Sequence, residues 1–169
     1  MTLLFHAQPY DISAEGFYFR SLDEYDSQAK TLKNQHGDAV EEFEIQFIDG
    51  EAIDCDLAKA WGVNQANLAG FFDAIDVWSE DWKFRYIIAV GECGYSHDQV
   101  ADDPEAIDLI IYQAETLREL AEHFVDEGLY GDIPERLQFY LDYDAIARDL
   151  GMDYAQTTIG GTALIYRGD

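Results

Sequence analysis

The chain has 169 residues and a mass of 19.2 kDa, which is enough for one ordinary domain or a few very small ones and too short for an α/β barrel. It carries 35 acidic and 10 basic residues, a formal net charge of −25. Because nucleic acids and anionic membranes are bound through Lys and Arg, this balance excludes an anionic membrane surface and strongly disfavours direct binding to nucleic acid. The chain should still fold, since 48% of its residues are hydrophobic and 14% are aromatic.

The two cysteines, Cys55 and Cys93, are isolated, with no C-x-x-C pair, so the sequence indicates neither a zinc site nor a disulfide scaffold. A reducing compartment is therefore expected. The N-terminal residues show no basic stretch followed by a long apolar one, and no run approaches the roughly 18 apolar residues of a membrane span. We accordingly expect a cytoplasmic protein.

The first third of the chain predicts strands and one helix. Apolar runs at 2–6 and 16–20 have the composition of strands. The sequence Ser21-Leu22-Asp23-Glu24 is a capping box, which predicts a helix that continues until Gly37. Residues 43–47 alternate apolar and polar side chains, as in a strand with one buried face.

The middle of the chain predicts helices, and the last third returns to mixed patterns. Residues 56–90 show helical spacing, with a predicted N-cap at Asn64 and a second helix starting at Ser79, and an acidic loop follows at 98–105. The later predicted elements are a strand at 107–112, helices at 115–127, after Pro134 and at 142–150, and a β-hairpin of 154–158 and 162–167 joined across Gly160-Gly161.

These patterns predict an α+β fold built as an elongated chain of three small units. The first is an α+β unit at 1–60, the second a helical unit at 61–104, and the third an α+β unit at 105–169 with a C-terminal β-hairpin. Each unit is too small to be very stable alone, so packing between units or between subunits is expected to matter.

The only compact group of reactive side chains is the loop Glu92–Asp98, which contains Cys93 and His97. No strand-to-helix nucleophile turn accompanies it, so a small polar loop is the simpler interpretation than a catalytic site. Neither Asp73–Asp81 nor Asp98–Asp108 has the ligand spacing of a calcium loop, and no glycine-rich phosphate loop occurs. We therefore predict no metal, no cofactor and no catalysis.

Acids dominate the stretch from Tyr86 to Glu135, where thirteen acidic residues accompany a single base, Arg118. In the predicted helix at 115–127, four acids recur at i, i+4, i+7 and i+11 and fall on one face. Given the rise of about 1.5 Å per residue, this places a charge about every 4.5–6 Å, comparable with phosphates along a DNA strand. Any single acid of this stretch is explained by an ordinary solvent-exposed helix face. Clustered like charges, however, repel one another and destabilise the folded state, so we expect the whole stretch to serve a function that offsets this cost.

Residues 124–150, FVDEGLYGDIPERLQFYLDYDAIARDL, resemble the C-terminal part of the ArdA-family antirestriction proteins. In that family an E-G-L-x-G-D-I-P stretch precedes an L-D-Y-D-A-x-A-R-D-L helix. Similar length, three-piece layout and acidity extend the resemblance over most of the chain, with residues 1–19 less alike.

The resemblance implies an acidic homodimer that mimics B-form DNA and occupies the DNA-binding groove formed by the specificity and modification subunits of type I restriction-modification enzymes. Such inhibitors are carried by mobile genetic elements, need no cofactor and are not enzymes. The family's antirestriction motif corresponds to 129–144 here. The acids that we expect to face the target, called the candidate acids below, are Asp102, Asp103, Glu105, Asp108, Glu115, Glu119, Glu122, Asp126, Glu127, Asp132, Glu135, Asp142 and Asp144. The apolar residues that we expect in the core or between subunits are Leu129, Tyr130, Ile133, Leu137, Phe139 and Tyr140.

Three other functions remain open from the sequence. The first is an acidic decoy or chaperone for other basic DNA-binding proteins, such as nucleoid proteins. The second is a salt-adapted protein whose acids only keep it hydrated, and the third is a small enzyme that uses Cys93 and His97. The sequence leaves open which restriction enzymes are bound and whether modification is inhibited along with restriction.

Overall fold

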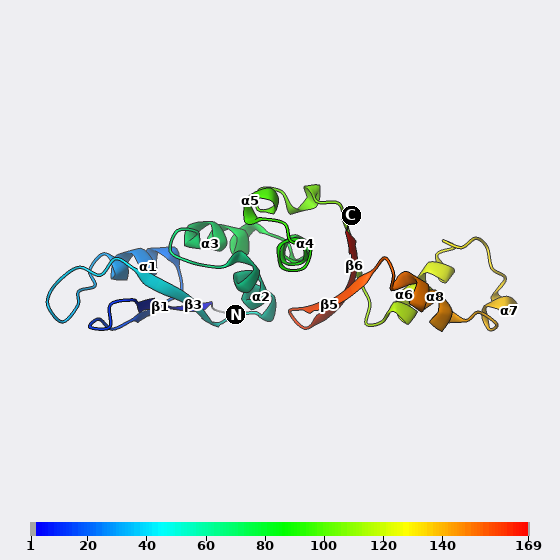
Figure 1. Ribbon diagram of the computed structural model, residues 1–169, viewed down its shortest axis with the longest axis horizontal. Coiled ribbons are helices and arrows are strands. Elements are labelled where there is room, and N and C mark those ends of the chain that lie inside the picture. The colour runs from blue at the N-terminus through cyan, green and yellow to red at the C-terminus, as the bar shows by residue number, and fades with distance from the viewer. Residues whose placement is uncertain (1–2, 169) are drawn as a thin grey trace. The chain divides into compact units, whose positions relative to one another are not determined.

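The computed structural model describes residues 3–168. Within this range the chain forms eight α-helices, a short 3-10 helix and two three-stranded antiparallel sheets, which confirms the predicted α+β class. The residues group into two units, the first ending at Glu105 and the second beginning at Ala106. Figure 1 shows the elements of both units in chain order.

The first sheet has the strand order β2-β1-β3, with β1 at Leu4–Pro9, β2 at Phe17–Phe19 and β3 at Phe43–Asp49. Alternate side chains of each strand point to one face, where most of them are buried aromatic or aliphatic groups. Helices α1 (Leu22–Ala29) and α3 (Leu68–Val77) lie over this face (Figure 1). Rings from the three layers form the core: Phe5 lies 5.8 Å from Phe71 and Phe19 lies 5.1 Å from Tyr25 between ring centroids.

Two predicted boundaries in this sheet and helix were wrong. In the described residues the first strand starts at Leu4 and runs on to Pro9, while residue 2 lies outside the described range. Helix α1 ends at Ala29 instead of near Gly37, because Asn34 organises a turn: its side-chain oxygen accepts hydrogen bonds from the backbone N–H groups of His36 and Asp38, both at 2.9 Å.

The middle helices also differ from the prediction in their starting points. Helix α2 (Ala52–Trp61) begins before residue 56, with Glu51 as its N-cap. Helix α3 begins after Asn67 instead of after Asn64, because the Asn64 side chain accepts the Ala66 N–H at 2.9 Å and closes a turn before the helix. Ser79 caps α4 (Glu80–Gly91) as predicted, accepting the Trp82 N–H at 3.3 Å.

Ring contacts and a buried ion pair join the predicted first and middle units. The Phe5 ring of β1 lies 5.8 Å from the Phe71 ring of α3 between centroids, and so connects the two. Lys83 of α4 donates to Asp54 of α2 at 2.7 Å, with both side chains buried. These contacts explain why the structure holds residues up to 105 together in one unit, and the predicted division at residue 60 has no counterpart in it. Two short helices complete this part of the chain, α5 at His97–Val100, inside the predicted loop, and the 3-10 helix at Pro104–Ala106.

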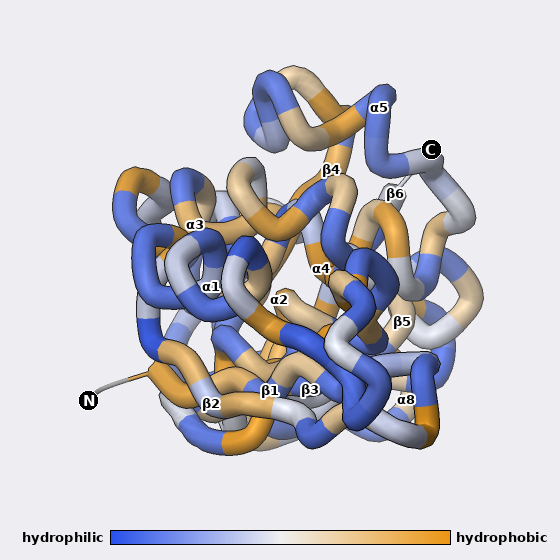
Figure 2. The backbone as a smooth tube through the Cα atoms, turned by 90° about the vertical axis from the view of Figure 1, so that its left-hand side faces the viewer, coloured by the Kyte–Doolittle hydropathy of each residue, from blue (hydrophilic) through white to orange (hydrophobic). Residues whose placement is uncertain are grey.

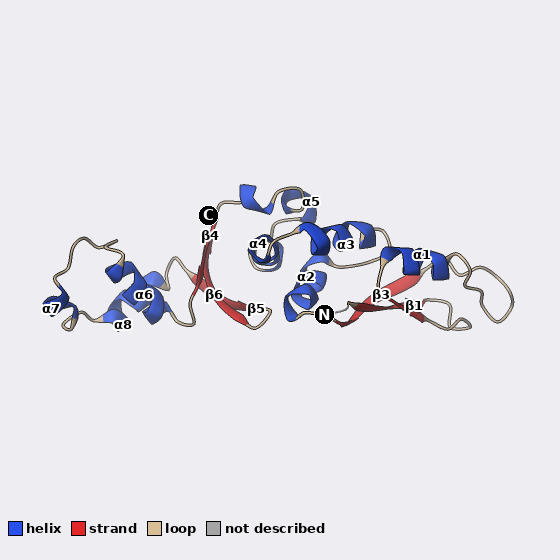
Figure 3. Ribbon diagram, turned by 180° about the vertical axis from the view of Figure 1, so that it is seen from behind, coloured by secondary structure: helices blue, strands red, loops and turns tan. Residues whose placement is uncertain are grey.

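The second unit contains a sheet of order β4-β6-β5, with β4 at Leu109–Gln113, β5 at Ala155–Ile159 and β6 at Thr162–Gly168. Strands β5 and β6 form the predicted hairpin, whose two-residue turn requires the positive φ angles of 58° and 84° found at Gly160 and Gly161. Helices α6 (Leu117–Asp126) and α8 (Tyr143–Leu150) lie side by side, and α7 (Glu135–Gln138) lies at the end of this unit away from its sheet (Figures 1 and 3).

The core of the second unit lies between α6 and the sheet. Leu120 and Phe124 of α6 pack against Ile165 of β6, with Tyr112 of β4 and Tyr154 at the edge of this cluster. The backbone tube coloured by hydropathy shows hydrophilic and hydrophobic stretches in close alternation (Figure 2). No helix in the described range is both long and apolar enough to cross a membrane.

Candidate functional site: an acidic surface on α6 and its neighbours

Helix α6 has one buried and one charged face, as the sequence predicted. Leu120, Ala121, Phe124 and Val125 are buried, while the acids of the helix are exposed. The helix starts two residues later than predicted, because Thr116 is its N-cap and accepts the Glu119 N–H at 3.1 Å. Three of the four acids in the predicted stripe, Glu119, Glu122 and Asp126, therefore lie on the helix, and Glu115 lies before its cap.

The Glu119 carboxylate closes the start of α6. It accepts the backbone N–H of Glu115 at 2.8 Å, as Glu24 does for the backbone N–H of Arg20 at 2.7 Å before α1. A Ser or Thr followed three residues later by Glu marks both helix starts. The T-L-R-E sequence at 116–119 is therefore the local signal for the start of α6, and the predicted start at residue 115 did not use it.

Arg118 is the one base of α6, and it is engaged by two acids. Its guanidinium donates to Glu122 at 3.1 Å on the same helix and to Asp144 of α8 at 2.7 Å. The hydrogen bond to Asp144 is the main reason that the pKa of Arg118 is raised above its usual value. The bond to Asp144 links α6 to α8 at the surface, and the two acids together offset the charge of Arg118.

All of the candidate acids are exposed, so their carboxylates can meet a partner. Several also have a local role: Asp142 caps α8 by accepting the Ala145 N–H at 3.0 Å, and Glu127 lies 3.4 Å from the His123 ring nitrogen. Seven of the thirteen carboxylates have no hydrogen-bond or ion-pair partner within residues 3–168: Asp102, Glu105, Asp108, Glu115, Asp126, Asp132 and Glu135.

The structure brings together only part of the predicted set. Glu119, Glu122 and Asp126 share one helix face, and Arg118 links Glu122 to Asp144. Asp102, Asp103 and Glu105 belong to the first unit, where Asp103 accepts the Glu105 N–H at 3.1 Å in the turn that opens the 3-10 helix.

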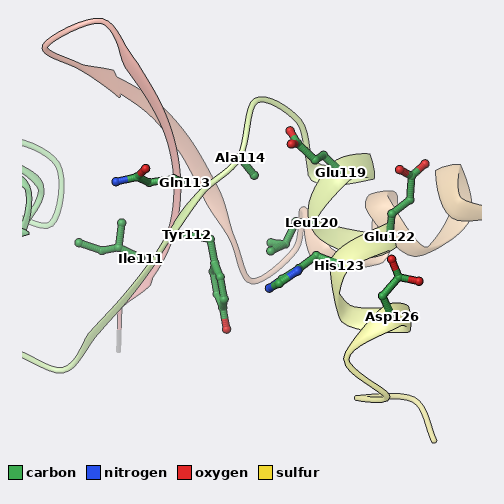
Figure 4. A pocket seen from close by; sticks show the side chains of 9 residues that line it. All are labelled: Ile111, Tyr112, Gln113, Ala114, Glu119, Leu120, Glu122, His123 and Asp126. Carbon is green, nitrogen blue, oxygen red and sulfur yellow. The ribbon is translucent and has the colours of Figure 1, made fainter. Parts of the chain in front are cut away.

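An open hollow of about 470 Å³ lies beside this acidic face, between β4 and α6. Leu120 and His123 extend from α6 toward the side where the Tyr112 ring lies, and Glu119, Glu122 and Asp126 lie along the same helix (Figure 4). Burial raises the pKa of Tyr112, and the nearby Tyr154 and Glu127 add to the shift, so this phenol stays neutral at ordinary pH. No sequence pattern marks Tyr112 or His123 as a candidate site residue.

The six apolar residues of the predicted motif belong to the segment of the chain that connects α6 to α8. Five of them are exposed in the single chain: Leu129, Tyr130, Leu137, Phe139 and Tyr140, with Phe139 at 94% and Tyr140 at 85% of full exposure. Ile133 is half-buried. A role in the core of the chain, which the sequence allowed, therefore does not describe the five exposed residues.

The loop 92–98 lacks the geometry of a nucleophilic site. The His97 ring nitrogen Nδ1 lies 2.8 Å from the Tyr86 hydroxyl, and the ring packs 4.5 Å from the centroid of Trp61. His97 is thus engaged by Tyr86 and Trp61. Burial, with the charge of Glu92, raises the pKa of Cys93 and disfavours its thiolate. Among residues 3–168, no group of three or more His, Cys, Asp and Glu is arranged to hold a metal ion.

Taken together, the fold and site define an acidic α+β protein whose candidate site is a carboxylate surface instead of a catalytic cleft. A comparison with protein families matches residues 7–163 to the antirestriction protein (ArdA) family. Because the match spans most of its 169 residues, the chain belongs to the ArdA antirestriction family, a family of non-catalytic inhibitors, and the resemblance of residues 124–150 is confirmed. Comparison with individually curated proteins gave no match.

Proposed function

We propose that this antirestriction protein works as a mimic of B-form DNA that occupies the DNA-binding groove of type I restriction-modification enzymes. The observation that carries the proposal is the exposed set of candidate acids, in which the one base of the acidic helix, Arg118, is already engaged by Glu122 and Asp144. At one charge per about 1.7 Å of duplex, a net charge of −25 corresponds to about 42 Å of B-DNA.

Such an inhibitor needs no chemistry of its own. Its carboxylates pair with the Lys and Arg side chains that otherwise contact phosphates, and binding releases the counterions held around both surfaces. Both processes lose strength as salt rises. The affinity of the protein for its target should therefore fall steeply with salt concentration.

The proposal extends to a homodimer formed through the apolar residues that lie between α6 and α8. Five large apolar side chains exposed in one short segment are unusual for a monomer and are typical of an interface. Figures 1 and 3 show that α7, which carries Leu137, lies at the end of the second unit away from its sheet. A second copy could approach this segment without disturbing the core around Leu120 and Phe124.

A competition titration tests the DNA mimicry. Purified protein is added to the methyltransferase core of a type I enzyme bound to labelled duplex, at NaCl concentrations from 50 to 200 mM. We expect displacement at near-stoichiometric protein at low salt, and an apparent affinity that falls by about a thousandfold or more over the series, as for six or more phosphate-like contacts. An affinity of the protein for the enzyme that does not change with salt, once the salt dependence of the duplex's own affinity is accounted for, would rule out the mechanism. Failure to displace DNA at large excess would move the function to another basic DNA-binding protein.

Sedimentation equilibrium tests the dimer. Replacing Phe139 and Tyr140 together by Ser should give a monomer that keeps its far-ultraviolet circular dichroism, because both side chains are almost fully exposed in the single chain. Ile12→Ser is the matched control, since Ile12 is equally exposed but lies in the first unit. A wild-type monomer at micromolar concentration, or an unchanged dimer in the double variant, would contradict this interface.

A further inference from the structure

We propose that the hollow between β4 and α6 binds one arginine side chain of the protein that this chain inhibits. The inference rests on the proposed function and adds to it a defined site where one guanidinium of the target is held. The hollow joins two features that suit a long cationic side chain: an apolar lining and carboxylates at its edge, of which Asp126 has no ion-pair partner within residues 3–168.

The size and lining of the hollow suit the aliphatic stem of arginine. Its volume is about 470 Å³, enough for one long side chain together with part of its backbone. Leu120, Ala114 and the ring of Tyr112 form the apolar part of the lining. Arginine covers such surfaces with its methylene groups and keeps its charged end at the edge, so the stem loses little by leaving water.

The acids beside the hollow suit the guanidinium end. Asp126 has no hydrogen-bond or ion-pair partner within residues 3–168, while Glu122 accepts from Arg118 through Oε1 and Glu119 accepts a backbone N–H through Oε2. The second carboxylate oxygen of each glutamate makes no hydrogen bond to residues 3–168. A guanidinium carries five N–H donors in one plane and can bond to two carboxylates at once, which an ammonium group does less well.

The positions of Tyr112 and Arg118 also favour an arginine that comes from the partner protein. The Tyr112 ring projects into the hollow (Figure 4), where a planar cation can stack on its face. The chain's own Arg118 does not line the hollow: it donates to Asp144, and its guanidinium carbon lies 5.9 Å from the centroid of the Tyr143 ring on α8. The residues that line the hollow include no Lys or Arg, and the imidazole among them, His123, lies 3.4 Å from Glu127, so the site can take a cation from outside the chain.

A titration of the whole isotope-labelled protein followed by NMR tests the site without any restriction enzyme. The probes are N-acetyl-arginine amide, N-acetyl-lysine amide and the neutral isostere N-acetyl-citrulline amide. With the arginine probe we expect saturable shifts confined to the amides of 111–114 and 119–126, with weaker shifts from lysine and none from citrulline. Shifts spread evenly over all exposed acids, or equal shifts from arginine and lysine, would overturn the proposal.

A pair of variants then tests whether the target uses the site. Glu122→Gln with Asp126→Asn removes two charges beside the hollow, and Asp73→Asn with Asp76→Asn removes two exposed charges from α3 as the matched control. We expect the first pair to weaken binding to the methyltransferase core about tenfold or more, and the control about twofold. Equal losses would refute the arginine site and leave DNA mimicry in place. If the wild type does not bind the core, the proposed function fails, and the NMR titration still decides whether the hollow binds arginine.

Discussion

The ion pair of Asp54 and Lys83 is the clearest case of a single contact that the first unit depends on. The two groups lie 2.7 Å apart, with 7% and 11% of their side chains exposed. Lys83→Met should lower the free energy of unfolding by about 3–5 kcal/mol, because it leaves the Asp54 carboxylate buried without a partner. All three tryptophans, Trp61, Trp78 and Trp82, belong to this unit, so urea unfolding followed by tryptophan fluorescence measures the loss directly.

The matched control is the double variant Asp54→Leu with Lys83→Met, which removes both charges. It should recover most of the lost stability, since apolar groups of similar size replace a buried ion pair at little cost. A loss below about 1 kcal/mol in Lys83→Met alone would mean that water reaches the carboxylate and that the pair contributes little.

Because of Tyr86, the stability of the first unit should decrease at alkaline pH. Tyr86 is fully buried, and this burial raises its pKa from 10.0 to about 12. Between pH 10 and 12 the unfolded chain therefore loses the Tyr86 proton before the folded chain does, and stability falls as pH rises through this window. Below pH 10 the contribution is fully present.

Tyr86→Phe tests this behaviour, because phenylalanine keeps the ring and cannot ionise. At pH 9 the wild type should be the more stable protein by about 1 kcal/mol, through the hydrogen bond of 2.8 Å between the Tyr86 hydroxyl and His97. In urea unfolding at pH 9, 10, 11 and 11.5 this advantage should shrink steadily. A difference that stays constant over the series would show that the Tyr86 hydroxyl ionises equally in both states.

At the level of elements, the capped start of α6 supports the acidic face. Thr116→Ala removes the acceptor of the Glu119 N–H and should destabilise the helix by about 1 kcal/mol. Because the second unit has no tryptophan, amide hydrogen exchange of residues 117–126 is the suitable measurement. Thr116→Ser keeps the hydroxyl and is the control. Equal exchange rates in the two variants would show that the cap does not hold this helix.

Elements fixed by local signals could be predicted from the sequence. Gly160 and Gly161 adopt the positive φ angles that a two-residue hairpin turn requires. The Ser79 hydroxyl caps the first turn of α4, immediately before the helical spacing of apolar residues begins. The acids of α6 were placed on an exposed face for a similar reason, since the opposite face must bury Leu120 and Phe124.

The rest depended on contacts between residues distant in the sequence. Phe5 packs against Phe71 and Asp54 pairs with Lys83, and no local pattern shows that these contacts join the predicted first and middle units. The hollow beside α6 likewise needs Tyr112 of β4, a residue that reads as an ordinary strand position. Asn34 and Asn64 ended or delayed helices through side-chain hydrogen bonds that compete with the backbone.

For the molecule as a whole, negative charge is shared by both units. The sequence up to residue 105 holds 22 acids and 6 bases, and the sequence from 106 holds 13 acids and 4 bases. A surface of this kind repels itself in the folded state, and the cost is largest in dilute buffer, where the screening length is about 30 Å at 0.01 M salt and about 10 Å at 0.1 M. The charge that favours a basic partner therefore lowers the stability of the free protein.

Salt should accordingly act in opposite directions on folding and on binding. Raising NaCl from 10 to 200 mM should increase the free energy of unfolding in urea, because the repulsion is screened, and should weaken binding to the target over the same range. The Asp73→Asn, Asp76→Asn variant should show a smaller gain in stability with salt than the wild type. Far-ultraviolet circular dichroism at 10 mM NaCl should still show the folded helices, since both units have apolar cores. Loss of that signal at 10 mM would instead favour a salt-adapted protein whose acids serve hydration, and a stability independent of salt would mean that counterions already neutralise the surface.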